Sequence, residues 1–71
     1  MRAANREPED VLMPQIVKLL EADRRPMCTL TIRARLKTDQ HSAVVWRACK
    51  QAEGLGLITA NEAGHFLANQ P

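Results

Sequence analysis

Aromatic residues are almost absent from this chain of 71 residues, which has one Phe, one Trp and no Tyr. A hydrophobic core must therefore be built from Leu, Ile, Val and Ala, a composition that suits helices better than a β-sandwich. The interleaved aromatic side chains on which RNA-binding modules stack bases are also lacking, so RNA binding is the weakest functional hypothesis.

The chain is also too short for a catalytic domain with a deep cleft, and its length predicts a single domain. It has no glycine-rich loop of the kind that cradles phosphates, and its Ser, His and Asp residues form no local activating motif. We therefore expect no enzymatic activity and no cofactor.

Cysteine is scarce as well, since Cys28 and Cys49 form no CxxC pair and no apolar leader segment is present. Two isolated cysteines predict a reduced, cytoplasmic protein in which each thiol is a small buried hydrophobe. Cys28, Cys49, His41 and His65 match no common zinc-ligand spacing, so no metal site is expected. No apolar run approaches the roughly 18 residues of a membrane-spanning helix, so no membrane partner is expected.

The net charge is only +2, with an isoelectric point near 8.8, but the charges are distributed unevenly. The first third of the chain is acidic and contains Glu7, Glu9, Asp10, Glu21 and Asp23. Between residues 24 and 50 a single acid, Asp39, accompanies Arg24, Arg25, Arg33, Arg35, Lys37, Arg47 and Lys50. This basic centre is a better guide to an anionic partner than the total charge is.

A first helix is predicted over residues 8–23, at the start of a domain that spans residues 8–71 after a flexible arm at residues 1–7. Pro8 and Pro14 limit where it begins, because proline is tolerated only in the first turn. Glu9 and Asp10 lie where the helix dipole favours acids. The apolar stripe that this helix buries comprises Leu12, Ile16, Leu19 and Leu20, with Met13 or Val17 beside them.

Pro26 ends that helix, and residues 27–28 are predicted to form a short extended piece or small edge strand. A second helix follows and runs to Leu36 or Lys37, with Ile32 and Leu36 as its buried positions. Its N-cap is expected to be Thr29 or Thr31. Residues 38–41 form a turn, after which a third helix is capped by Ser42 or by Asp39.

The third helix is predicted over residues 42–54 and has two contrasting sides. At about 100° per residue, one side is small and apolar and gathers Val44, Val45, Ala48, Cys49, Ala52 and Leu55. The other side is basic and carries Ala43, Trp46, Arg47 and Lys50. The major groove of DNA accepts such a helix, although an ordinary amphipathic helix with solvated charges has the same pattern.

A β-hairpin is predicted at the end of the chain. Gly54 and Gly56 are expected to end the third helix in a left-handed conformation. Strands at residues 57–60 and 65–68 then flank a turn at 61–64, in which Gly64 suits a positive φ. A turn of this length pairs Ala60 with His65, Thr59 with Phe66 and Ile58 with Leu67.

Three helices with a tight turn before the third, followed by a hairpin, resemble the winged helix-turn-helix superfamily. Residues 45–58, VWRACKQAEGLGLI, resemble the family's recognition helix and its Gly-Leu-Ile exit into the wing, and residues 29–36 resemble the scaffold helix. The resemblance covers roughly residues 11–68. It implies a mainly α fold of three helices with a small hairpin, residues 57–68, as the wing. Arg33 and Lys37 stand where such domains usually have alanine and glycine.

The resemblance also implies a function, namely a DNA-binding transcriptional regulator or accessory protein whose third helix enters the major groove of double-stranded DNA. Ser42, Ala43 and Arg47 would face the bases, with Arg47 on guanine and Ala43 on a thymine methyl group. Lys50 would hold a phosphate. The other phosphate contacts that the resemblance implies are Arg33, Arg35 and Lys37, together with His65 as an exposed residue beside the wing turn.

Winged helices also serve as protein-interaction modules, so the same face supports an alternative function. Trp46 favours this alternative because tryptophan is enriched in the hot spots of protein interfaces. The domain would then be an adaptor or an inhibitor of a larger complex. Two other roles for Trp46 stay open, namely packing within the chain, for example against the hairpin, and contact with DNA. On DNA, a homodimer on a two-fold site is a further hypothesis, since so small a domain binds weakly alone.

Overall fold

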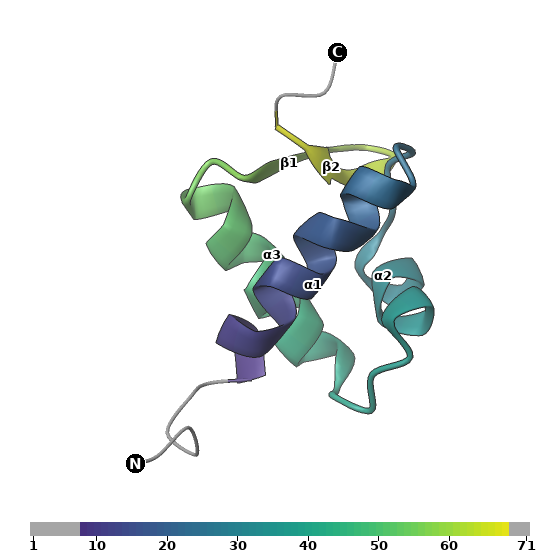
Figure 1. The fold of residues 1–71 in the computed structure, drawn as a ribbon, viewed down its shortest axis with the longest axis vertical. Helices are drawn as coiled ribbons and strands as arrows, with labels where there is room; N and C mark the ends of the chain where they lie inside the picture. The colour runs from purple at the N-terminus through teal and green to yellow at the C-terminus, as the bar shows by residue number, and fades with distance from the viewer. Residues whose placement is uncertain (1–7, 69–71) are drawn as a thin grey trace.

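The computed structural model describes residues 8–68, which form three helices followed by a two-stranded antiparallel hairpin (Figure 1). Helix α1 spans Pro8–Ala22, α2 spans Thr29–Leu36 and α3 spans Ser42–Gly54, while β1 is Ile58–Asn61 and β2 is Gly64–Leu67. This is the layout of a winged helix-turn-helix, so the predicted fold class is confirmed. The predicted arm at residues 1–7 lies outside the described residues.

Helix α1 lies across α3, with α2 to one side and the hairpin across the end of the bundle (Figure 1). It contributes Leu12, Ile16 and Leu20 to the core, one from each turn. Small residues of α3, Ala48 and Ala52 among them, are fully buried and let the helices approach closely. The core residues are Leu12, Ile16, Leu20, Met27, Ile32, Val45, Ala48, Cys49, Ala52 and Ile58. The predicted stripe is confirmed except at Leu19, which packs only at the edge of this core.

Pro14 lies inside α1, not in its first turn as predicted. Because the helix begins at Pro8, the carbonyl group of Asp10 has no backbone donor at Pro14, which costs on the order of 3 kcal/mol in a helix interior. Asp10 and Pro14 are both exposed, so water can reach that carbonyl. Burial of the apolar stripe keeps the helix continuous across this position.

The N-caps predicted for α2 and for α3 are wrong. Cys28 precedes α2, and its Sγ lies 3.2 Å from the Thr31 hydroxyl without capping the helix. His41 caps α3, because its Nδ1 accepts a hydrogen bond from the backbone N–H of Ala43 at 3.1 Å. The Nδ1 of histidine is as many bonds from the backbone as the side-chain oxygen of asparagine, so it serves the same purpose.

The end of α3 is closed by Gly56 at φ 78°, while Gly54 is the last helical residue and has no positive φ. The backbone N–H groups of Gly56 and Leu57 donate to the carbonyls of Glu53 and Ala52, each at 3.0 Å, which is a Schellman motif. Leu55 therefore lies beyond the helix and is 65% exposed, so the prediction that it is buried is wrong.

The hairpin has the predicted register, with Ile58 opposite Leu67 and Thr59 opposite Phe66. Each strand is shifted by one residue, because only Glu62 and Ala63 form the turn. On the other edge of β2, Met27 and His65 exchange two backbone hydrogen bonds of 2.9 and 2.7 Å. The predicted extended piece is therefore present as a single bridge that joins the hairpin to the chain before α2.

Candidate nucleic-acid interface

The outer face of α3 carries four exposed residues from the predicted site, Ala43, Trp46, Arg47 and Lys50. Ser42, at the start of the helix, is half-buried. The Nζ of Lys50 lies 5.7 Å from the centre of the Trp46 ring and 3.2 Å from a carboxylate oxygen of Glu53. The structure thus brings these residues together on one face, as the helical spacing predicted.

Arg47 is anchored within the chain. Its Nε donates a hydrogen bond of 2.7 Å to the carboxylate of Glu9, in the first turn of α1. This hydrogen bond is the main reason that the pKa of Glu9 lies below its ordinary value. The Arg47 side chain nevertheless remains 55% exposed. A guanidinium has five N–H donors, so the terminal nitrogens keep donors for an outside partner.

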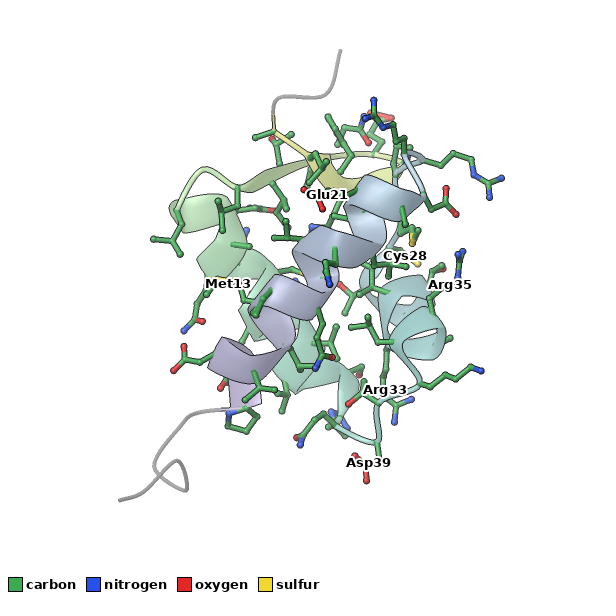
Figure 2. The ribbon with its side chains drawn as sticks, viewed as in Figure 1. Met13, Glu21, Cys28, Arg33, Arg35 and Asp39 are labelled. Carbon is green, nitrogen blue, oxygen red and sulfur yellow. The ribbon has the colours of Figure 1, made fainter. Side chains whose placement is uncertain are left out.

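Arg33 and Arg35 leave α2 in different directions, and Arg33 turns toward the loop that carries Asp39 (Figure 2). The Nε of Arg33 donates to the backbone carbonyl of Gln40 at 2.6 Å, which ties α2 to the turn before α3. Nη1 of Arg35 lies 3.1 Å from the carboxylate of Asp23. Both predicted phosphate contacts therefore have partners within the fold.

Asp23 gathers two arginines at the junction of α1 and α2. Arg25 donates to both carboxylate oxygens, through Nε at 3.1 Å and Nη2 at 3.2 Å, and Arg35 donates to one of the same oxygens through Nη1 at 3.1 Å. The hydrogen bonds from Arg25, and then from Arg35, hold the pKa of Asp23 well below its usual range. Acids from the first third of the chain thus partly neutralise the positive charges that were predicted to lie on the DNA face.

His65 is buried and 8% exposed, so the expectation of an exposed residue within reach of a phosphate is wrong. Its Nε2 lies 3.4 Å from the Thr29 hydroxyl and its Nδ1 lies 3.3 Å from a carboxylate oxygen of Glu53. Nδ1 makes no hydrogen bond of good geometry within residues 8–68. The ring therefore joins the hairpin to α2 and α3 and does not belong to the outer face.

A shallow groove of about 470 Å³ lies between the N-terminal ends of α2 and α3 and was not predicted. It is lined by Thr29, Leu30, Ser42, Ala43 and Trp46. Leu30 is 66% exposed and Trp46 is 51% exposed, which is unusual for large apolar side chains on one surface. One feature of the sequence could have indicated this groove. Leu30 lies two positions before the buried Ile32 in the same helix, so its side chain faces away from the core.

Within residues 8–68, no three His, Cys, Asp or Glu side chains are placed to hold a metal ion. No helix in the same range is long and apolar enough to cross a membrane.

Comparisons of the chain with protein-family models, with curated protein sequences and with solved structures found no match.

Proposed function

We propose that this domain binds double-stranded DNA, as a transcriptional regulator or an accessory protein, by placing α3 in the major groove. The observation that carries the proposal is the division of α3 into two sides. Val45, Ala48, Cys49 and Ala52 are buried against the core, while Ala43, Trp46, Arg47 and Lys50 are exposed. A helix exposed on one side in this way can enter a groove about 12 Å wide.

The residues have separate roles in this proposal. Arg47, held in place by Glu9, reads guanine with its terminal nitrogens, and Ser42 and Ala43 approach neighbouring base edges. Lys50 and the exposed Lys37 contact phosphates. Arg33 positions α3 through the turn, and Arg35 through its Asp23 contact stabilises the start of the helix-turn-helix.

The test is a titration of a fluorescently labelled mixed-sequence duplex at several salt concentrations, followed by anisotropy. Binding should weaken with salt by about 0.9 log units per neutralised phosphate and log unit of salt. Lys50→Ala should weaken binding and reduce the salt slope by about one. Lys18→Ala removes an exposed lysine of α1 and should change neither quantity. No binding even at low salt would rule out the DNA-binding function.

A second candidate function, a protein-interaction module, is favoured by the exposure of Leu30 and Trp46 on either side of the groove. In that case Trp46→Ala should impair the biological activity more than the double substitution of Arg47 and Lys50 by alanine. Under the DNA-binding function the double variant should be the more damaging. Native mass spectrometry with and without duplex would test the hypothesis of a homodimer.

A further inference from the structure

We propose that the groove between α2 and α3 makes the domain selective for thymine, by accepting the 5-methyl groups that thymine presents in the major groove. This inference rests on the proposed DNA-binding function, because the groove lies on the same face as Arg47 and Lys50. The sequence suggested one methyl contact at Ala43 alone. The structure adds Leu30, from a different helix, and Trp46 as further walls of one apolar surface.

The chemistry of the lining points to a small apolar ligand group. Leu30 and Trp46 expose large hydrophobic surfaces, and between them lie only the short side chains of Thr29, Ser42 and Ala43. No ionisable side chain lines this groove. Thymine is the standard base that presents a methyl group in the major groove, so this surface favours thymine over the other three bases.

The charges around the groove indicate that the methyl groups belong to DNA. Lys50 lies seven positions after Ala43 on the same side of α3, and its Nζ lies 5.7 Å from the centre of the Trp46 ring. Arg47 adds a second exposed cation on this face. An apolar surface bordered by positive charges complements the major-groove edge, where methyl groups lie between two rows of phosphates.

The experiment begins with selection of a tightly bound duplex from a random pool. Each thymine of the selected duplex is then replaced in turn by uracil, which removes the 5-methyl group and leaves base pairing unchanged. At one or two positions, uracil should weaken wild-type binding about fourfold for each methyl group that is buried. Anisotropy of the labelled duplex measures the affinity, and quenching of Trp46, the single tryptophan, reports on the groove itself.

A matched pair of variants assigns the effect to the groove. Leu30→Ala should abolish the difference between thymine and uracil, whereas Leu55→Ala, at an equally exposed leucine outside the groove, should preserve it. If wild-type protein binds the duplex but no thymine position responds to uracil, the inference is overturned while the DNA-binding function stands. If no duplex is enriched or bound at low salt, the proposed function itself fails. Quenching of Trp46 by an acidic amphipathic peptide but not by duplex would overturn both and assign the groove to a protein partner.

Discussion

The Nε of Arg47 on α3 lies 2.7 Å from a carboxylate oxygen of Glu9 in the first turn of α1. The contact covers Glu9, which is 8% exposed although it carries a charge. It joins the outer edge of α3 to the helix that packs behind it. The orientation of the arginine on the proposed DNA face therefore depends on an acid from the start of the domain.

This ion pair makes stability depend on pH in a defined direction. The pKa of Glu9 in the folded protein lies below its ordinary value of 4.5, mainly because of the hydrogen bond from Arg47. A lowered pKa contributes stability that is complete above the unfolded value and is lost as the pH falls through the folded value. Glu9→Gln should therefore lower the melting temperature at neutral pH, and its difference from wild type should shrink as the pH falls below 4.5.

Thermal unfolding followed by circular dichroism measures both effects. Asp10→Asn is the control, because it removes an acid from the same turn of α1 and so tests for loss of the helix-dipole interaction alone. An Asp10→Asn variant as destabilised as Glu9→Gln would show that the contact with Arg47 adds nothing.

Gly64 should not tolerate a side chain. Its φ is 138°, and a Cβ there would collide with the backbone carbonyl group of Met27. We expect Gly64→Ala to destabilise the fold by about 2–4 kcal/mol, because the strained backbone and the overlap both cost free energy. Gly54→Ala is the matched control, since Gly54 is helical with open space around it and alanine there should be neutral or stabilising by about 0.5 kcal/mol. Equal urea midpoints for the two variants would contradict this assignment.

Lys37 occupies the left-handed C-cap of α2 at φ 56°, which is the position where winged helices usually have glycine. A residue with a side chain costs about 1–2 kcal/mol in this conformation, and glycine removes that cost. Part of the gain is offset, because a glycine loses more conformational entropy when the chain folds. We expect Lys37→Gly to raise the free energy of unfolding by about 0.5–1 kcal/mol. Lys37→Ala removes the charge but keeps the strain, so chemical denaturation should find it less stable than Lys37→Gly.

The two cysteines should react at very different rates. Cys28 is exposed at the start of α2 (Figure 2), so the prediction that its thiol is buried is wrong, and the Thr31 hydroxyl lowers the pKa of this thiol. Burial, and then the charge of Glu53, raises the pKa of Cys49 to about 11. A disulfide reagent at mildly alkaline pH should modify one thiol per chain quickly, and Cys28→Ser should remove that phase. Two thiols of equal reactivity in the folded protein would contradict the burial of Cys49.

Features with local causes could be predicted from the sequence. Leu12, Ile16 and Leu20 recur once per turn, so the buried side of α1 follows from helical periodicity. The hairpin register and the positive φ of Gly64 follow from the chemistry of a short turn. The buried and exposed sides of α3 follow from its spacing, and this prediction fails at Leu55 of the apolar side, where the helix has already ended.

Only the tertiary structure decided what the polar side chains contact. Arg47 contacts Glu9, which lies 38 positions away in the sequence, and Arg35 contacts Asp23, which lies 12 positions away. His65 lies between Thr29 of one helix and Glu53 of another. Spacing within one helix determines which side a residue lies on, but not which neighbouring element meets that side. The apolar groove has the same origin, because Leu30 and Trp46 become neighbours only when α2 and α3 pack together. The sequence by itself therefore determined the elements and the face of α3, and the packing of the elements decided which charges on that face remain available.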